Sequence, residues 1–467
     1  MPFTVNPTIF RAYDIRGIVD QDLSEQVYAT LGRAAGTYFR QRGGRTIVVG
    51  HDARLTSPAY AAALIEGLRS TGCAVIDLGM VPTPLMYFAQ AYLQADGGAI
   101  VSASHNPPEF NGLKLRQAEP TYGGEPLNGE QIQELGRLAN SGEFASGAGT
   151  YEQRDLSEIY IADVVQRFKL AEPIKVVLDG GNGVAGPLGQ RTLEAIGCEV
   201  VPLYVEPDGT FPNHHPDPLK EANLQDLIAK VRETGAALGI ALDGDGDRLG
   251  VVDGAGTIVF ADRYLIVLAQ HVLAQGAAPI VFDVKCSSVL PEAIEAAGGT
   301  PIMSKTGYPN QSATMREVGA PLAGELSGHV LTSLPFHTFD DGTFAGCYLL
   351  YALARRGQTL AQALEPYPPL PSLSEGRIPF PEAYKFKVIE HIRAYFEGRY
   401  PVIDIDGVRV DFGDGWGLVR ASNTEPAITT RFEARTLERA AAIREMMLAQ
   451  VEAFRQQIAT STPAGTV

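Results

Sequence analysis

A serine and a histidine in a proline-bounded loop are the first residues of this sequence whose types could do chemistry. The loop reads Ser102-Ala103-Ser104-His105-Asn106-Pro107-Pro108 and follows the apolar run Gly98-Ala99-Ile100-Val101, which is typical of a buried strand. The two prolines exclude a helix or a central strand, so Ser104 and His105 lie on a rigid turn at a strand end. An ordinary strand-closing turn is one interpretation, and a nucleophilic or phosphate-carrying Ser104 is the other.

A second loop holds three aspartates at alternate positions. It reads Asp243-Gly244-Asp245-Gly246-Asp247-Arg248 and lies between two strand-like apolar runs. Three carboxylates on a glycine-rich loop can converge on one hard cation such as Mg²⁺, and they would repel one another without a cation or Arg248 nearby. A calcium hand loop does not fit, because its sixth position, usually glycine, is Arg248 and its twelfth, usually glutamate, is Gly254. An acid-rich surface turn is the alternative.

Two further polar loops could bind a phosphorylated ligand. Gly324-Glu325-Leu326-Ser327-Gly328-His329 offers side chains that can hydrogen-bond the hydroxyl groups of a sugar. Arg420-Ala421-Ser422-Asn423-Thr424-Glu425-Pro426 combines an Arg, hydroxyls, an amide and backbone N–H groups, which suits a phosphate dianion. Taken alone, each is also compatible with a plain polar loop. Together the four loops favour phosphoryl transfer on a sugar phosphate, in which a metal and cations offset the charge that moves between oxygens.

The elements that must position these loops form a threefold repeat along the chain. The apolar runs at 46–49, 175–178 and 280–282 each end near an acidic residue. Each is followed by a helical stretch and then by a glycine that opens a second apolar run. Strand, helix and strand at this spacing predict parallel sheets with crossover helices. Three copies at a spacing of about a hundred residues predict three similar α/β domains, with chance resemblance among common units as the alternative.

Two linkers and a change of pattern complete the predicted architecture. The loop-like stretch 140–149 and the proline-rich stretch 367–372 separate segments of different pattern. Beyond the second, short strands and helices predict a smaller α+β domain. The predicted domains are 1–150, 151–253, 254–367 and 368–467, holding the serine, metal, sugar and phosphate loops in that order. The predicted fold class is α/β, with three similar mixed α/β domains, a smaller C-terminal α+β domain and an active site in the central cleft.

Composition bounds the class of function. The chain has 467 residues, of which 45% are hydrophobic, and no apolar run approaches the roughly 18 residues of a transmembrane helix. The net charge of -16 argues against nucleic acid or an anionic membrane as the main partner, although local Arg and Lys could still bind an anionic substrate. Four scattered cysteines without a CxxC pair, and an N-terminus unlike a signal peptide, predict a cytoplasmic protein. These features leave a monomer and a homodimer equally open.

With these motifs in this order, the chain resembles the α-D-phosphohexomutase family, most closely its bacterial phosphomannomutase/phosphoglucomutase branch. The resemblance covers nearly the whole chain and includes the opening segment Phe10-Arg11-Ala12-Tyr13-Asp14-Ile15-Arg16-Gly17. It implies that Ser104 is carried as phosphoserine, and that the ligands of one Mg²⁺ are Ser104, Asp243, Asp245 and Asp247. The catalytic residues that it implies are Ser104, His105, Lys114, Arg248, Lys285 and Tyr308. The substrate-binding residues that it implies are Tyr13, Arg16, Lys285, Tyr308, Glu325, Ser327, His329, Arg420, Ser422, Asn423 and Thr424.

The mechanism that the resemblance implies has two phosphoryl transfers. Phosphoserine at position 104 gives its phosphoryl group to the free hydroxyl of a hexose 1- or 6-phosphate, the hexose being mannose, glucose or both. The resulting 1,6-bisphosphate turns over in the cleft, and its other phosphate then returns to Ser104. Glucose or mannose 1,6-bisphosphate is the implied activator, and hexose phosphates are the implied partners. A mobile fourth domain behind the proline-rich linker would allow the intermediate to turn.

One position departs from the family pattern, and other functions stay open. Where relatives usually have Thr-Gly-His, this chain has Thr306-Gly307-Tyr308, and a tyrosine with an ordinary pKa of about 10 is a poorer proton carrier at neutral pH. A phosphoglucosamine mutase shares the motifs, but usually has Gln where this chain has Leu326. A haloacid-dehalogenase-type phosphatase would use an Asp nucleophile and would not need Ser104. A sugar-phosphate sensor that lost turnover through Tyr308 is the non-catalytic alternative.

Overall fold

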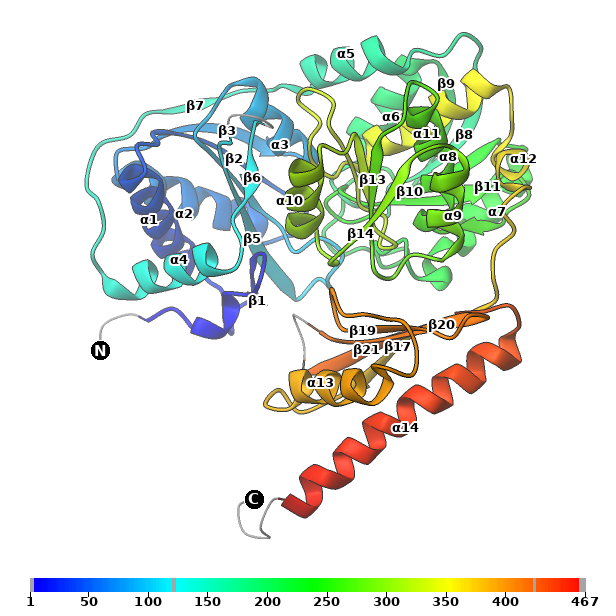
Figure 1. The fold of residues 1–467 in the computed structure, drawn as a ribbon. Coiled ribbons are helices and arrows are strands. Elements are labelled where there is room, and N and C mark those ends of the chain that lie inside the picture. The colour runs from blue at the N-terminus through cyan, green and yellow to red at the C-terminus, as the bar shows by residue number, and fades with distance from the viewer. Residues whose placement is uncertain (1–3, 120–122, 423–425, 462–467) are drawn as a thin grey trace.

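The computed structural model describes residues 4–119, 123–422 and 426–461, with side chains described as far as residue 458. Figure 1 shows four sheets with helices packed against them, and we call each sheet with its helices a domain. The first domain lies beside the second and third, and the fourth lies across one end of this group. Within the described residues, no helix is long and apolar enough to span a membrane.

The first three sheets are built on the same arrangement of four strands. In each, the first strand lies between the second and the third and runs parallel to both, and the fourth strand turns back antiparallel to the third. The strands of the first domain are β2 (Thr46–His51), β3 (Ala74–Met80), β4 (Gly97–Val101) and β5 (Phe110–Gln117). Those of the second are β8 (Ile174–Asp179), β9 (Cys198–Leu203), β10 (Leu238–Leu242) and β11 (Leu249–Asp253). Those of the third are β13 (Pro279–Asp283), β14 (Thr300–Ser304), β15 (Leu322–Gly324) and β16 (Val330–Thr332), which confirms the predicted three similar mixed α/β domains.

Glycine ends the crossover helix at the equivalent place in each repeat. Gly72, Gly197 and Gly298 follow α2 (Ser57–Ser70), α6 (Gly186–Ile196) and α9 (Val289–Ala296) and have φ of 86°, 115° and 80°. A residue with a Cβ is strained in this left-handed region, whereas glycine is not, so the chain can leave the helix and enter the second strand. The glycine signal read from the sequence therefore has a direct conformational cause.

The remaining helices cover both faces of these sheets. In the first domain they are α1 (Glu25–Gln41), α3 (Thr83–Tyr92) and α4 (Glu130–Ser141), and in the second α5 (Ser157–Phe168) and α7 (Gln225–Thr234). In the third they are α8 (Ala261–Leu273), α10 (Tyr308–Val318), α11 (Gly342–Arg356) and α12 (Leu360–Leu364). One continuous cluster of buried apolar side chains contains residues from all three domains, among them Tyr87, Leu178 and Leu265. The first three domains therefore share a core and hold one another in place.

Short elements lie in a different sheet from the one their predicted domain range would give. The strand β7 (Tyr151–Gln153) pairs with β3 of the first domain, and β12 (Ile258–Val259) pairs with β11 of the second. The helix α11 packs against α5, α6 and β11 as well as α8. The first sheet also gains β1 (Ile15–Ile18) and β6 (Glu125–Pro126) beside β5. The exact predicted boundaries remain predictions, because chain segments cross between neighbouring sheets.

The fourth domain is a smaller antiparallel sheet covered by two helices on one face. Its strand order is β17-β21-β20-β19-β18, and the long helix α14 extends along it in Figure 1. The strands are β17 (Ser372–Pro379), β18 (Val402–Ile403), β19 (Val408–Asp411), β20 (Gly415–Ala421) and β21 (Ala427–Ala434), and the helices α13 (Lys385–Phe396) and α14 (Leu437–Ser461). This confirms the predicted C-terminal α+β domain. The four cysteines of the chain are free and buried.

The N-terminus of α11 contains a buried carboxyl that makes stability depend on pH. Asp341 accepts hydrogen bonds from Phe344 N at 2.9 Å and from the Tyr160 hydroxyl of α5 at 2.7 Å. Burial raises the pKa of Asp341 from 3.8 to about 7, against the effect of these two hydrogen bonds. The protonated carboxyl therefore stabilises the fold at low pH, and this contribution is lost as pH rises through about 7.

Replacing Asp341 by Asn should remove that pH dependence, because an amide does not ionise and still caps the helix. The free energy of unfolding of Asp341→Asn minus that of the wild type should increase by up to about 2 kcal/mol from pH 5 to pH 8. Urea denaturation at both pH values measures this. The exposed Tyr204–Asp226 hydrogen bond of 2.9 Å provides the control, and Asp226→Asn should shift stability by less than about 0.5 kcal/mol at either pH. An Asp341→Asn difference that is the same at both pH values would contradict the assignment.

Candidate active site

Each loop singled out in the sequence connects the two strands of an antiparallel pair. The serine loop joins β4 to β5, the aspartate loop joins β10 to β11, and the sugar loop joins β15 to β16. These are equivalent positions in the three repeated sheets. The phosphate loop joins β20 to β21 in the fourth domain. Two of its predicted ligands, Asn423 and Thr424, lie outside the described residues.

Ser104 is buried and held in an uncommon backbone conformation. Its φ is 50°, in the left-handed region that residues with a Cβ rarely adopt, and its N–H donates to Ser102 Oγ at 2.9 Å. Its hydroxyl donates to Asp243 Oδ2 at 2.6 Å, and His105 Nδ1 lies 3.1 Å from Ser104 Oγ. Burial lowers the pKa of His105 well below its usual range, so the imidazole beside Ser104 is neutral at pH 7.

Arg54 binds the backbone carbonyls of the serine loop. This residue was not identified from the sequence. Its Nη2 donates to the carbonyls of Ser104 and Asn106 at 2.8 and 2.6 Å, and its Nη1 to those of Pro107 and Phe110 at 2.7 and 2.9 Å. Its Nε donates to Asp52 Oδ2 at 3.2 Å, and the side chain is 1% exposed. Four carbonyls on one guanidinium fix the backbone of the loop, and this offsets the strain at Ser104.

The aspartate loop approaches the serine loop so closely that glycine is required between its acids. A Cβ at Gly244 would lie 2.4 Å from the Ser104 carbonyl oxygen. Asp243 Oδ1 accepts from the backbone N–H groups of Gly246 and Arg248 at 3.0 and 3.1 Å, which closes the loop on itself. The serine of the first domain and the carboxylates of the second thus form one site.

Lys114 and Thr83 of the first domain partly compensate the buried carboxylates. Lys114 Nζ lies 2.6 Å from both Asp245 Oδ2 and Asp247 Oδ2, and Thr83 Oγ1 donates to Asp245 Oδ2 at 2.5 Å. Burial raises the pKa of Asp245, but Lys114 together with the hydrogen bonds from Thr83 and Ser104 outweighs it, and the net shift is downward. Burial, followed by the neighbouring carboxylates, raises the pKa of Asp243 well above its usual range and also raises that of Asp247.

The carboxylates of this loop fit a hard divalent cation. One oxygen from each of Asp243, Asp245 and Asp247 lies within 4.8 Å of the others. Among the described residues, the buried Oδ1 atoms of Asp245 and Asp247 have no hydrogen-bond partner. A cation ligated by these oxygens would satisfy both atoms and would favour the ionised form of all three acids.

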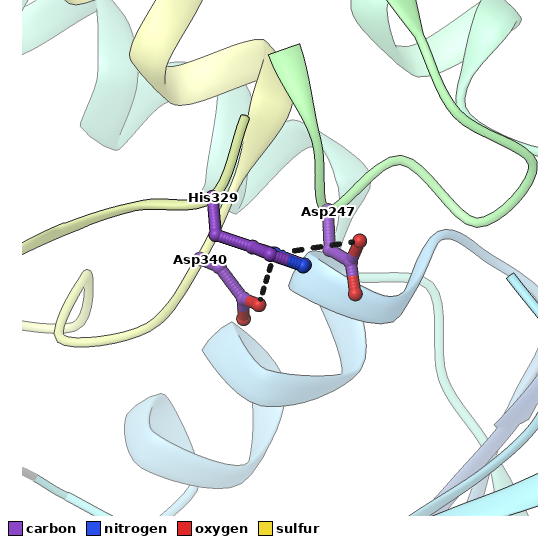
Figure 2. A group of neighbouring side chains, drawn as sticks. All are labelled: Asp247, His329 and Asp340. Carbon is purple, nitrogen blue, oxygen red and sulfur yellow. Dashed lines mark ion pairs between the residues drawn. The ribbon is translucent and has the colours of Figure 1, made fainter. Parts of the chain in front are cut away.

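A histidine of the third domain completes this part of the site. Figure 2 shows His329 between Asp340 and Asp247, with Nδ1 at 2.7 Å from Asp340 Oδ2 and 3.8 Å from Asp247 Oδ1. Burial lowers the pKa of His329, but these carboxylates outweigh it and raise the pKa to about 9. Arg248 Nε lies 3.1 Å from His329 Nε2, a contact that is a hydrogen bond only while that nitrogen is unprotonated. With its pKa at about 9, His329 is protonated at neutral pH, so its Nε2 does not accept a hydrogen bond from Arg248 there.

The sugar loop is tied to the ends of the other strands of the third domain. Glu325 Oε1 accepts from Gly307 N at 2.8 Å, and Glu325 Oε2 accepts from the Ser327 hydroxyl at 2.7 Å. Asp283, at the end of β13, accepts from Leu326 N at 3.1 Å and from the Thr306 hydroxyl at 2.8 Å. Burial raises the pKa of Glu325. These bonds hold the Glu325 carboxylate and the Ser327 hydroxyl together on one loop.

The ring of Tyr308 lies at the contact between the first and third domains. It stacks on Tyr87 with ring centroids 6.0 Å apart, and its hydroxyl is buried with no hydrogen-bond partner in the described part of the chain. Burial raises the pKa of Tyr308 further above that of an ordinary tyrosine. This disfavours a proton-carrier role, while the predicted contact of Tyr308 with substrate stays a prediction.

The residues predicted from the opening segment lie beside loops of other parts of the site. Arg16 Nη1 donates to Asn106 Oδ1 of the serine loop at 2.5 Å. The Tyr13 hydroxyl accepts from Asn310 Nδ2 of α10 at 3.3 Å, and its ring faces Gly307. These contacts connect the N-terminal segment to both the serine loop and the third domain.

The phosphate loop is linked to the third domain through Asp406. Arg420 Nη2 lies 2.9 Å from Asp406 Oδ2, which also accepts from Thr306 N at 3.1 Å. Arg420 Nε is buried and has no partner among the described residues. Lys285 Nζ lies 3.7 Å from Glu375 Oε2 of the fourth domain. Ser422 is buried at the start of the loop.

Comparison with known proteins follows the same four-part division. Models described as the alpha/beta/alpha domains I, II and III and the C-terminal domain of phosphoglucomutase/phosphomannomutase match residues 7–146, 158–256, 260–370 and 375–450. The chain is 44% identical over 452 residues to a phosphomannomutase/phosphoglucomutase of Pseudomonas aeruginosa, with 96% of each chain covered. It is 40% identical over 439 residues to a phosphoglucomutase of Neisseria gonorrhoeae, with 93% of this chain and 94% of that one covered.

A solved structure agrees with these relatives. The X-ray structure of a phosphoglucomutase/phosphomannomutase family protein from Burkholderia thailandensis superposes with a TM-score of 0.90 at 41% identity, covering 99% of both chains. The chain belongs to the phosphoglucomutase/phosphomannomutase family of α-D-phosphohexomutases. This confirms the family, the fold class and the class of enzyme predicted from the motifs.

Replacing Arg54 by Lys should disturb the serine loop, because an ammonium group cannot reach four carbonyls from one point. We expect a loss of roughly ten- to hundredfold in kcat for hexose phosphate conversion and a loss of about 2–4 kcal/mol in free energy of unfolding. Enzyme kinetics and urea denaturation measure the two effects. Arg42→Lys, at the exposed Arg42–Glu134 pair, is the matched control and should cost less than about 1 kcal/mol. A kcat for Arg54→Lys within about twofold of the wild type would contradict the positioning role.

Proposed function

We propose that this enzyme interconverts hexose 1-phosphates and hexose 6-phosphates, with mannose or glucose as the sugar, through phosphoserine at position 104 and a hexose 1,6-bisphosphate. The observation that supports this most is the 2.6 Å contact between the Ser104 hydroxyl and Asp243. It joins a strained, buried serine to a cluster of carboxylates from another domain. A serine in such a place serves chemistry better than it serves folding.

In the proposed reaction, two phosphoryl transfers take place between Ser104 and the sugar. The phosphoryl group leaves Ser104 Oγ for the free hydroxyl of the substrate; this hydroxyl loses its proton, and Ser104 Oγ takes one up. After the bisphosphate has turned over, its other phosphoryl group moves to Ser104 Oγ, which loses its proton, and the sugar oxygen that is left behind takes one up. The Ser104 hydroxyl donates to Asp243 Oδ2 at 2.6 Å, and neutral His105, with Nδ1 at 3.1 Å from Ser104 Oγ, is the second group placed to accept its proton. Arg248, Lys285 and His329 are the candidates for handling the proton of the substrate hydroxyl.

The cations around the aspartate loop have a defined electrostatic task. Lys114 contacts both Asp245 and Asp247, and the carboxylates of Asp243 and Asp247 also interact with the charge of Arg248, so both cations offset the charge of this loop. We propose that Mg²⁺ is held by Asp243, Asp245, Asp247 and an oxygen on Ser104. When bound, it would offset negative charge on the transferring phosphoryl group. Fixed charges in a buried site need no rearrangement at the moment of transfer.

Substrate recognition is proposed to divide between the third and fourth domains. Glu325 and Ser327 would hydrogen-bond sugar hydroxyls, while Arg420, Ser422, Asn423 and Thr424 would bind the phosphate that does not react. Tyr13, Arg16, Lys285, Tyr308 and His329 are the further proposed contacts. We also propose a cytoplasmic location, which the four free, buried cysteines support.

The first experiment supplies purified protein with Mg²⁺ and a trace of glucose 1,6-bisphosphate. Glucose 1-phosphate, mannose 1-phosphate and glucosamine 1-phosphate are each assayed for conversion to the 6-phosphate and for release of free phosphate. Turnover of glucose and mannose phosphates, with glucosamine phosphate much slower, is the expected result. Preferential turnover of glucosamine 1-phosphate would indicate a phosphoglucosamine mutase instead. Free phosphate without any 6-phosphate would reject the mutase and indicate a phosphatase.

Ser104→Ala should abolish the phosphoenzyme and lower mutase turnover by roughly 10³-fold or more, because the group that is phosphorylated is gone. Intact-mass measurement detects the phosphoryl adduct in the wild type, and circular dichroism verifies that the variant is folded. Ser102→Ala, two residues away in the same loop, is the comparison, because the Ser102 hydroxyl has only a structural role as the acceptor of the Ser104 backbone N–H. Wild-type activity in Ser104→Ala would contradict the proposed mechanism.

Tyr308→His should keep kcat within about threefold of the wild type if the position only needs a planar ring at the domain contact. Its pH–rate profile should also stay unchanged, because the buried Tyr308 hydroxyl does not exchange protons at neutral pH. Kinetics between pH 6 and pH 9 measure both. A large loss of kcat would show that the tyrosine hydroxyl is specifically required.

A further inference from the structure

One face of the fourth domain is covered by helices, and the opposite face is covered by the third domain. Val408, Val410 and Val419 point to the face under α13 and α14 and belong to the core of the fourth domain. Because side chains alternate along a strand, Arg409 and Leu418 lie on the opposite face. Both are nonetheless buried, at 6% and 1% exposure, which shows that this face is docked.

Arg409 binds two backbone carbonyls of the third domain, one on each side of Lys285 in the sequence. Its Nη1 donates to the carbonyl of Val284 at 2.6 Å and to the carbonyl of Cys286 at 2.9 Å. The residue between these two carbonyls is Lys285, a proposed catalytic and substrate-binding residue. The Arg409 guanidinium also stacks on the ring of Trp416, with its central carbon 3.6 Å from the ring centroid, so its direction is fixed.

Neighbouring side chains of the fourth domain hold the same segment at other points. Glu433 Oε1 accepts from Ser288 N and Ser288 Oγ at 3.0 and 3.1 Å, and from Trp416 Nε1 at 2.8 Å. Glu375 Oε2 lies 3.7 Å from the Lys285 ammonium nitrogen itself. The fourth domain therefore contacts both the backbone and the charged end of Lys285.

We propose that Arg409 is a positioning residue through which the fourth domain sets the place of Lys285 in the active site. The inference rests on the proposed function, since it is that function which gives Lys285 its role. The same sheet that presents Arg420 to the substrate phosphate holds, through Arg409, the backbone that presents Lys285. A movement of the fourth domain that breaks the two carbonyl bonds also frees the Lys285 segment, so phosphate binding and Lys285 placement are coupled.

The geometry explains why arginine stands at this position. One guanidinium nitrogen spans the two carbonyls, while the planar group stacks on the indole of Trp416. A lysine ammonium lacks the planar surface for stacking and is strongly hydrated, so it would hold the carbonyls less firmly in this buried place.

The test compares Arg409→Met and Arg409→Lys with Arg431→Met in the full-length enzyme. Arg431 lies in the same interface and pairs with Asp262 at 3.4 Å, but it does not bind the carbonyls beside Lys285. Hydrogen exchange is followed at the amides of Cys286 and Ser288, and not at Ser287, whose N–H donates to Asp262, the partner of Arg431. The constants kcat and KM are measured with glucose 1-phosphate. Small-angle X-ray scattering reports whether the fourth domain is still docked, because the emission of Trp416, the single tryptophan of the chain, changes directly when its stacking partner Arg409 is replaced.

We expect Arg409→Met to speed exchange at these amides by about tenfold or more and to lower kcat/KM by roughly ten- to hundredfold. Arg409→Lys should give an exchange rate and a kcat/KM between those of Arg409→Met and the wild type. It serves as the test if Arg409→Met does not fold. Arg431→Met should leave both quantities within about threefold of the wild type.

Two results would overturn the inference. Unchanged exchange and kcat/KM in both Arg409 variants would show that Lys285 does not depend on Arg409. Equal effects of Arg409→Met and Arg431→Met would show that docking in general, and not the two carbonyl bonds, is what matters. Absence of mutase turnover in the wild type would instead reject the proposed function, and the exchange comparison alone would then decide whether Arg409 holds the segment.

Discussion

Three buried carboxylates in one loop impose the constraint on which the arrangement of the first three domains depends. Asp243 and Asp245 are fully buried and Asp247 is 3% exposed, so their charge must be compensated by neighbours or by a bound cation. The second domain provides Arg248, while Lys114 reaches the loop from the first domain and His329 from the third. Each domain that adds a charge to this loop is thereby fixed relative to the other two, and the shared apolar core makes this arrangement rigid.

The repeated sheet explains why these groups can meet at all. In every copy, the loop that joins the third strand to its antiparallel neighbour lies at the same edge, so packing the three copies together brings three equivalent loops to one place. The copies share a backbone arrangement and differ in chemistry: one loop presents a serine, one the carboxylates, and one Glu325 and Ser327. A site assembled in this way depends on domain contacts, which is why Gly244 must lack a side chain against Ser104.

The sequence was sufficient for the parts of the site that are local. The four loops, the strand-helix-strand repeat and the smaller last domain all have short-range patterns, and the structure and the relatives confirm the fold and the family. Arg54, Asp340 and Arg409 could not be found in the same way. Arg54 and Arg409 act on backbone carbonyls distant in sequence, and Asp340 acts through His329, so no motif identifies their partners. A faint signal existed for Arg54, which follows the strand-ending acid Asp52 by two residues.

The alternation of side chains in the fourth domain shows the limit of pattern reading in a further way. A strand that alternates valine with a charged residue, as Val408-Arg409-Val410-Asp411 does, predicts one buried and one solvated face. Arg409 breaks that expectation, because its charge is satisfied by two carbonyls and an indole ring instead of by water. A buried arginine that satisfies backbone groups of another domain holds that domain in one orientation, since few other placements would satisfy both partners. The fourth domain therefore docks in one defined orientation, and the segment that Arg409 binds contains Lys285.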